Sequence, residues 1–115
     1  MPWWIALLNT LAALASTGFG VAALVKPALI APRTDDSTIS RFYPAMYAAR
    51  AIPLGLAVSI AVWLPATSTL LLLLGAAILA QVGDVIIGGL HRLPGMTAGA
   101  LFAVLCHGAA VLATL

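Results

Sequence analysis

Three ionisable side chains stand inside long apolar stretches of this chain: Arg50, Asp84 and His107. Near the middle of a bilayer a charged side chain costs about 2.5–3.5 kcal/mol on insertion scales, so such residues are functional candidates by default. An arginine can stabilise developing negative charge, whereas an aspartate or a histidine can exchange protons. Histidine titrates closest to neutral pH and is the better proton shuttle. The three residues predict acid/base catalysis, with Asp84 or His107 as the general acid/base.

Helical spacing predicts which other residues share this site. Tyr43, Tyr47 and Arg50 are spaced i, i+4, i+7 and would form one stripe on a helix. At a rise of about 1.5 Å per residue, Arg50 and Asp84 both lie roughly 9 Å from the same membrane face. We therefore expect the two charges to pair, with polar residues of the same slab around them. The predicted substrate-binding residues are Tyr47, Gln81, Tyr43 and Thr17.

The pairing of Arg50 with Asp84 has two interpretations that the sequence leaves open. The guanidinium is charged at any physiological pH and would compensate the carboxylate. Such a pair can line a ligand cavity, or it can simply hold two helices in register. Pro53 removes a helical hydrogen bond and exposes the carbonyl of Ala49, which could open a cavity or give Arg50 a backbone partner. His107 is either part of the site or an ordinary hydrogen-bonded interior histidine.

The elements that must position these residues are transmembrane helices. Of the 115 residues, 63% are hydrophobic and only 7% are charged, whereas a soluble domain carries about 25% charged residues. Four apolar runs each approach the roughly 20 residues that span a bilayer, at about 3–25, 44–64, 66–90 and 95–115. The runs do not alternate apolar with polar, which excludes a β-barrel. We expect an all-α fold, an integral membrane four-helix bundle with short loops, in one domain over residues 1–115.

Basic residues gather on one predicted membrane face, in the first and third loops: Lys26, Arg33, Arg41 and Arg92. The opposite face, which carries both termini, has no lysine or arginine. Since cytoplasmic loops carry the excess of basic residues, we expect both termini outside, in the inner membrane of a bacterium. Tryptophans at the outer helix ends fit an aromatic belt there: Trp3, Trp4 and Trp63.

Several classes of partner and chemistry are disfavoured. The lone cysteine, Cys106, excludes an internal disulfide and a Cys-x-x-Cys redox pair. We expect no metal, because a metal site needs three or four clustered donors, and no cofactor. So few charges offer no case for nucleic-acid binding. The expected partners are the lipid bilayer and a lipophilic small molecule, and stripes of small residues leave a homo-oligomer open.

Two runs of sequence, FYPAMYAARAIPLGLAV and AILAQVGDVIIGG, precede a histidine in the last apolar run. This pattern resembles the DoxX-like family of small four-helix membrane proteins. Their second helix carries an aromatic residue before an arginine and a glycine after it, their third a Gly-Asp pair, and their fourth a histidine. The matching residues are Tyr47, Arg50, Gly55, Gly83, Asp84 and His107. Many relatives place an acid directly after the arginine, where this chain has Ala51, which argues against a role for two carboxylates.

Three functions follow from these observations. The first is a small membrane-embedded enzyme of the isomerase or cyclase type, acting on an isoprenoid, quinone or polyketide-like molecule by acid/base chemistry. The second is a non-catalytic scaffold or partner subunit, in which the polar slab is structural. The third is a small multidrug-type transporter, which is disfavoured because such transporters rely on a glutamate in the first helix and this chain contains no glutamate.

Overall fold

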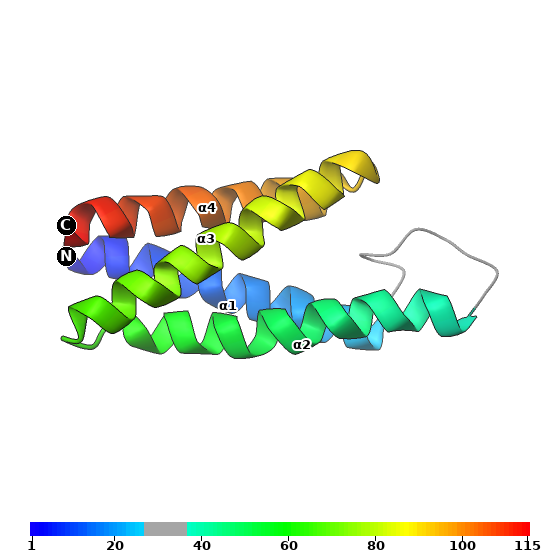
Figure 1. The fold of residues 1–115 in the computed structure, drawn as a ribbon, viewed down its shortest axis with the longest axis horizontal. Coiled ribbons are helices and arrows are strands. Elements are labelled where there is room, and N and C mark those ends of the chain that lie inside the picture. The colour runs from blue at the N-terminus through cyan, green and yellow to red at the C-terminus, as the bar shows by residue number, and fades with distance from the viewer. Residues whose placement is uncertain (27–36) are drawn as a thin grey trace.

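The protein is a bundle of four antiparallel helices. A computed structural model describes the backbone of residues 1–26 and 37–115, and the side chains of residues 1–26 and 44–115. The helices are α1 (Trp3–Val25), α2 (Ser37–Ala61), α3 (Thr67–Leu90) and α4 (Pro94–Thr114). Figure 1 shows both termini and the α2–α3 connection at one end, here called the terminal end, and the α3–α4 turn at the other, the loop end. The predicted all-α four-helix fold is confirmed.

All four helices are long and apolar enough to cross a membrane, which supports an integral membrane protein. Their outward faces carry large aliphatic side chains, among them Leu72, Leu79 and Leu112, each more than 70% exposed. Leucine so exposed is at home in hydrocarbon rather than water. At the terminal end the tryptophans Trp3 and Trp63 are also more than half exposed, as expected for a belt at the membrane–water interface.

The second helix begins at Ser37, seven residues before the predicted start at residue 44. The predicted start came from the apolar run alone, whereas the helix begins in the polar residues before it and runs through both Pro44 and Pro53. The candidate span of α2 is still Pro44–Ala61, so the added residues precede it. Three residues named above have side chains outside the described part of the chain: Arg33, Arg41 and Tyr43.

The helices pack in a ring in which each contacts its two neighbours. α1 packs closely on α2 and α3 on α4, the contact of α1 with α4 closes the ring, and the contact of α2 with α3 is the least extensive. Glycines mark the tight contacts: a Cβ added at Gly55 would lie 2.6 Å from the carbonyl oxygen of Ala13, and one at Gly88 would lie 2.6 Å from the hydroxyl of Thr97. Small residues let helix backbones approach closely in lipid, where no hydrophobic effect drives helices together.

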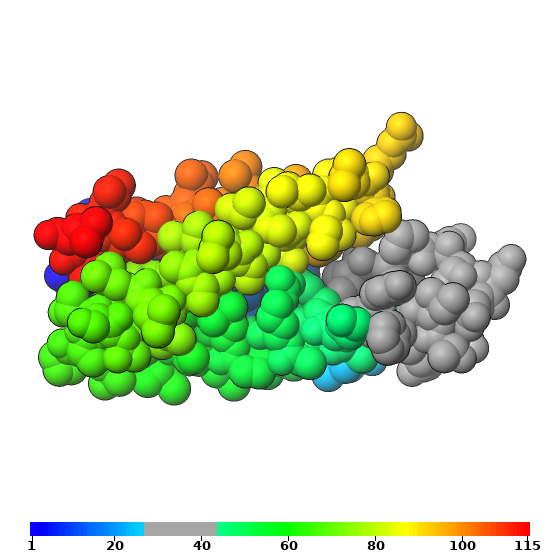
Figure 2. Space-filling model, in the orientation of Figure 1, coloured from blue at the N-terminus to red at the C-terminus, as the bar shows by residue number. Residues whose placement is uncertain are grey.

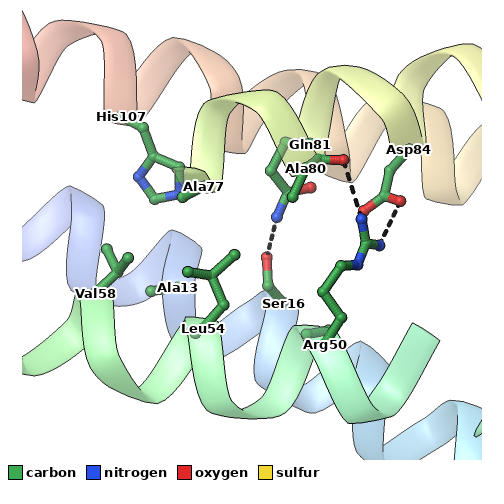
Figure 3. A pocket seen from close by; sticks show the side chains of 12 residues that line it. Ala13, Ser16, Arg50, Leu54, Val58, Ala77, Ala80, Gln81, Asp84 and His107 are labelled. Atoms are coloured by element: carbon green, nitrogen blue, oxygen red, sulfur yellow. Dashed lines mark hydrogen bonds and ion pairs between the residues drawn. The ribbon is translucent and has the colours of Figure 1, made fainter. Parts of the chain in front are cut away.

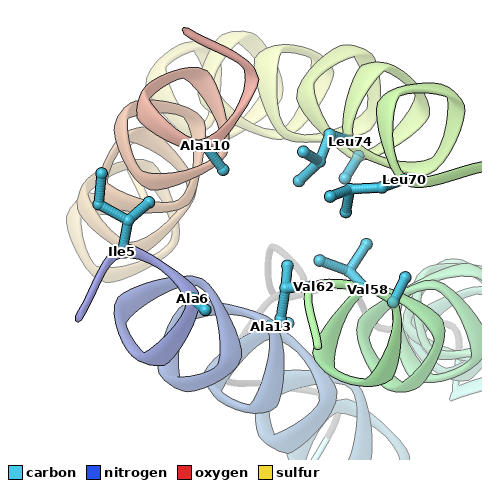
Figure 4. Close-up of a cluster of buried hydrophobic side chains, with 10 residues drawn as sticks. Ile5, Ala6, Ala13, Val58, Val62, Leu70, Leu74 and Ala110 are labelled. Atoms are coloured by element: carbon cyan, nitrogen blue, oxygen red, sulfur yellow. The ribbon is translucent and has the colours of Figure 1, made fainter. Parts of the chain in front are cut away.

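An apolar core fills the terminal end of the ring. Figure 4 looks along the bundle and shows side chains from all four helices pointing into its centre. Leu74 is fully buried and Val58 is nearly so. We call this cluster the apolar half, and its members are Ile5, Ala6, Ala13, Val58, Ala61, Val62, Leu70, Leu74, Ala77 and Ala110.

The helices α2 and α3 separate towards the loop end. The short connection between them holds their ends together at the terminal end, and α3 then runs diagonally away from α2 (Figure 1). Figure 2 shows a hollow between α2 and α3, with atoms of α1 visible at its floor. Three of the polar residues singled out in the sequence, Arg50, Gln81 and Asp84, line a cavity between these two helices.

Candidate functional site

An ion pair bridges the hollow between α2 and α3. Nη2 of Arg50 lies 2.6 Å from Oδ1 of Asp84, and Nη1 donates to the carbonyl oxygen of Ala80 at 3.4 Å (Figure 3). The arginine side chain is 42% exposed and the aspartate side chain 6%. The predicted pairing is confirmed. The backbone partner of Arg50 is a carbonyl of α3 rather than the carbonyl of Ala49, because a long side chain can cross where two helix backbones have separated.

Tyr47 lies one helical turn before Arg50 and stacks with it. The guanidinium carbon is 5.5 Å from the centre of the tyrosine ring, within the range of a cation–π interaction. Asp84 and Tyr47 therefore both fix the guanidinium, one through a charge-assisted hydrogen bond and the other through its ring face. The remaining N–H groups of Arg50 are available to a ligand, since a guanidinium has five donors.

A hydrogen bond between α1 and α3 crosses the interior of the ring. Nε2 of Gln81 donates to the hydroxyl of Ser16 at 2.8 Å. Gln81 is buried, and its amide oxygen remains as an acceptor. Ser16, Gln81 and Asp84 line both of the cavities described below, so this bond stands between the two.

A second polar cluster joins α4 to α1. Nδ1 of His107 lies 2.8 Å from Oδ1 of Asn9. The amide nitrogen of Asn9 donates to two carbonyl oxygens, those of Ile5 and Cys106, each at 2.9 Å. Both polar side chains are almost completely buried, His107 at 2% exposure and Asn9 at 0%. Buried polar groups in lipid need such partners, because an unsatisfied group there costs several kcal/mol.

Two small cavities lie beside these polar groups. The first, of about 20 Å³, opens between α2 and α3. It is lined by Ala13, Ser16, Arg50, Ala51, Leu54, Gly55, Val58, Ala77, Ala80, Gln81, Asp84 and His107. The second, of about 60 Å³, is lined by Ala12, Ala15, Ser16, Phe19, Tyr47, Gln81, Asp84, Met96, Gly99, Ala100 and Phe102. We call them the first and second cavity.

The structure brings most of the predicted site residues together. Arg50, Asp84, Gln81 and His107 line the first cavity, and Tyr47 lines the second. Thr17 lies elsewhere: its hydroxyl donates to the carbonyl oxygen of Ala13 at 3.0 Å, in the tight contact of α1 with α2. Tyr43 has no described side chain. The functions of these residues remain predictions.

Two polar residues of α1 bond to predicted site residues but were not among those predicted. Asn9 partners His107, and Ser16 partners Gln81. A signal for them exists in the sequence, because they share one helical stripe with Ala13 and Gly20. A polar residue on a stripe of small residues points to a helix–helix interface, where it finds a partner on another helix.

The hydrogen-bonding state of the site limits its chemistry. Within the described part of the chain, every buried side-chain nitrogen and oxygen that solvent does not reach has a partner. Among the same residues no three His, Cys, Asp or Glu side chains come together as a ligand set for a metal ion. What the first cavity offers a ligand is free donors on Arg50, a carboxylate, an amide oxygen and an imidazole edge.

Comparisons with family models, with curated proteins and with solved structures give no match to this chain.

Proposed function

We propose that this protein takes the oxygenated end of a neutral lipophilic molecule from the bilayer and moves a proton on it. The observation that carries the proposal is the shared lining of the first cavity, where Arg50, Asp84 and His107 meet beneath the hollow between α2 and α3. A charge stabiliser and two proton-exchanging groups around one cavity are the components of an acid/base site. The hollow between α2 and α3 is open to a ligand that already resides in lipid.

The charge balance of the site favours a neutral ligand with a carbonyl group. Asp84 already neutralises Arg50 at 2.6 Å, so an anionic head group would have to displace the carboxylate. A carbonyl oxygen needs only donors, and Arg50 has N–H groups left over after its bonds to Asp84 and Ala80. Quinones, polyketide-like molecules and oxygenated isoprenoids all carry such an oxygen on an apolar body.

The size of the first cavity restricts how such a molecule binds. A volume of about 20 Å³ accommodates roughly one water-sized group, since a single water needs about 10–15 Å³ by this measure. The carbonyl oxygen would enter the cavity with the carbon beside it at the cavity mouth within reach of His107, while the rest of the apolar body stays in the hollow against α2 and α3. Leu54 of α2 and Ala80 of α3 line this cavity and would contact the first carbons of that body.

The proposed reaction is a proton shift next to the carbonyl group. His107 accepts a proton from the carbon beside the carbonyl, and the electron pair of the broken C–H bond moves onto the oxygen as an enolate. Arg50 stabilises this oxyanion through its free N–H groups. Return of the proton to a different carbon completes an isomerisation, and attack of the enolate carbon on a second electrophile of the same molecule would close a ring.

The resemblance to DoxX-like proteins agrees with this placement of the site. The residues that carry it on α2, α3 and α4, namely Tyr47, Arg50, Asp84 and His107, line the two cavities. We also propose that the loop end faces the cytoplasm of a bacterial inner membrane, with both termini outside. In the described residues Lys26 and Arg92 lie at the loop end, whereas no lysine or arginine lies at the terminal end.

Photolabelling tests the binding step. The purified protein in lipid nanodiscs is exposed to a long-chain alkyl ketone with a diazirine near the carbonyl, and separately to the matched alkane diazirine. We expect the ketone to label the segments around Leu54 and Ala80 several-fold more than the alkane, and the excess to vanish in the double variant Arg50→Met/Asp84→Leu. Ser59→Ala, on the same helix outside the cavities, is the control and keeps the excess. Equal labelling by the two probes contradicts the proposal.

A proton-transfer assay tests the chemical step. A long-chain ketone whose double bond lies one carbon away from conjugation becomes conjugated when a proton shifts, which absorbance reports. We expect the protein to accelerate this shift over protein-free nanodiscs, and His107→Ala to lose most of the acceleration while retaining the ketone label. Acceleration that survives His107→Ala would remove the histidine from the mechanism.

The second candidate function is that of a structural subunit or scaffold. The observation in its favour is that the described buried polar groups satisfy one another, as they would in a bundle that needs no ligand. Under this alternative the double variant Arg50→Met/Asp84→Leu folds normally, and neither probe distinguishes it from the wild-type protein. The labelling experiment therefore separates the two candidates.

A further inference from the structure

We infer that Asn9 is a positioning residue that holds His107 in its Nδ1–H form and so presents an unprotonated Nε2 to the first cavity. The inference deepens the proposed function, on which its catalytic meaning rests. The two side chains are joined by the 2.8 Å contact between Oδ1 of Asn9 and Nδ1 of His107.

The orientation of the Asn9 amide is fixed by its surroundings. Its NH₂ group has two hydrogens, and two carbonyl oxygens lie 2.9 Å from the nitrogen, those of Ile5 and Cys106. A carbonyl oxygen can only accept, so the group facing both of them must be the donor. Rotating the amide by half a turn would place its oxygen against two other oxygens. The atom facing His107 is therefore the amide oxygen.

The orientation of Asn9 determines the tautomer of His107. An amide oxygen can only accept a hydrogen bond, so Nδ1 of the neutral imidazole must carry the hydrogen. The lone pair then resides on Nε2. Water would allow either tautomer, whereas this pair of buried side chains, at 0% and 2% exposure, admits one.

The free edge of the imidazole faces the cavity. Figure 3 shows the His107 ring pointing from α4 into the bundle beside Ala77, towards α1 and α2. The neighbours that line the cavity around it are apolar: Ala13, Leu54, Val58 and Ala77. The other charged or titratable groups on this cavity are Arg50 and Asp84, which lie towards the loop end. Nε2 is thus a proton acceptor held in an apolar corner of the cavity.

The arrangement explains why a polar residue sits at position 9. An asparagine there bonds its own helix at Ile5, the backbone of α4 at Cys106, and the imidazole of His107. In a ring of four helices, only α1 and α3 neighbour α4. Asn9 therefore acts on the histidine from the adjacent helix, without itself lining either cavity.

Nitrogen NMR of the side chain tests the inference directly. The chain has two histidines, so the variant His91→Gln leaves His107 as the only imidazole to be labelled with ¹⁵N. In lipid nanodiscs under mildly alkaline conditions, we expect one protonated nitrogen that couples to Cγ, the Nδ1 pattern, and an unprotonated Nε2. A dominant Nε2–H form, or a mixture of both forms, would overturn the inference.

Variants at two neighbouring positions supply the matched comparison. Asn9→Leu removes the acceptor, and we expect the Nε2–H form to become populated and ketone isomerisation to fall at least tenfold. Thr10→Val removes a hydroxyl that bonds Ala6 and Trp63 rather than His107, so the Nδ1–H form is retained. If Asn9→Leu does not fold, the tautomer of the folded His91→Gln protein still decides the question.

The experiment separates this inference from the proposed function. The NMR measurement needs no ligand, so an Nδ1–H histidine in a protein that neither labels with nor isomerises the ketone would leave the inference standing and remove the enzyme. A protein that isomerises the ketone but holds His107 in the Nε2–H form would support the proposed enzyme and overturn the inference about Asn9.

Discussion

The interior of this bundle is aliphatic in one half and partly polar in the other. At the terminal end the interior is aliphatic, with Leu74 fully buried and Val58 nearly so, and all four helices meet around it (Figure 4). Towards the loop end α2 and α3 separate, and the interior contains an ion pair, a polar hydrogen bond between α1 and α3, and two small cavities. The bond between Asn9 and His107 lies nearer the terminal end, beside Ala6 and Ala110 of the apolar half. The apolar half stabilises the packing of the four helices, whereas the half towards the loop end contains polar groups and small cavities.

The difference shows how a chain with 7% charged residues can maintain a polar site in lipid. An aliphatic cluster needs close packing on all sides, whereas Arg50 bridges separated helices with one long side chain. The site can therefore stay partly open without loss of the fold, because most of the apolar half and the tight contact at Gly88 lie outside the cavities, and the two halves meet at Val58, which belongs to the apolar half and also lines the first cavity.

Breaking the ion pair should have the largest effect. We expect Asp84→Leu to lower the free energy of unfolding by about 3 kcal/mol, the low end of the range for a broken buried pair, because the partly exposed Arg50 can turn towards the interface. The measurement is reversible unfolding in mixed detergent micelles. Replacing both partners, in Arg50→Met/Asp84→Leu, should recover most of the loss. A loss below about 1 kcal/mol for the single variant would show that the pair is not a stabilising element.

The apolar half should respond strongly to lost volume and the polar half weakly. We expect Leu74→Ala to cost about 2 kcal/mol, near the low end for large-to-small changes, since helices in lipid gain from packing but not from the hydrophobic effect. Leu54 is half-buried at the border of the two halves, where it lines the first cavity and packs on the edge of the apolar half. Leu54→Ala, which enlarges an existing cavity, should cost less than half as much. Both values come from the same unfolding assay, and equal costs would contradict the division into halves.

The tight contact of α1 with α2 should be sensitive to a single methyl group. A Cβ at Gly55 would lie 2.6 Å from the carbonyl oxygen of Ala13, whereas one at Gly83 would meet nothing within 4 Å. We expect Gly55→Ala to destabilise the protein by about 1–2 kcal/mol through overpacking, and Gly83→Ala to be neutral or slightly stabilising. Comparable losses in the two variants would mean that α1 and α2 can move apart freely.

The smallest effect should come from the α3–α4 turn at the loop end. Arg92 has φ of 54°, the left-handed region that favours glycine, and the N–H of Leu93 bonds back to the carbonyl oxygen of Gly88 at 2.8 Å. We expect Arg92→Gly to raise the free energy of unfolding by about 0.5–1 kcal/mol by relieving this strain. Arg92→Ala keeps a Cβ in the same conformation and should bring no gain.

The sequence was sufficient for the fold and for the central pair. Long apolar runs in a chain so poor in charge leave few alternatives to four spanning helices. The pairing of Arg50 with Asp84 followed from their equal depth on two helices. A charged residue inside an apolar run needs a partner of opposite charge, and these two residues could serve as partners for each other.

The partners of His107 could not be obtained in the same way. Asn9 and His107 lie six and seven residues from the ends of α1 and α4 at the terminal end, so their depths are similar, but depth does not tell that their side chains face each other. Thr17 follows Ser16 directly, yet successive residues of a helix point in different directions. Thr17 therefore faces α2, whereas Ser16 faces Gln81 of α3. Depth is readable from sequence, whereas helix rotation and crossing angle come from the packing.

The hydrogen bonds of Asn9 also bear on the order of assembly. One of its carbonyl partners, that of Cys106, is 97 residues later in the chain, so at the usual pace of translation it emerges about 5 to 20 s after the asparagine. Until then the first helix waits in the membrane with a polar amide that only the last helix can fully satisfy. A chain interrupted before α4 lacks two of the three hydrogen-bond partners of this amide.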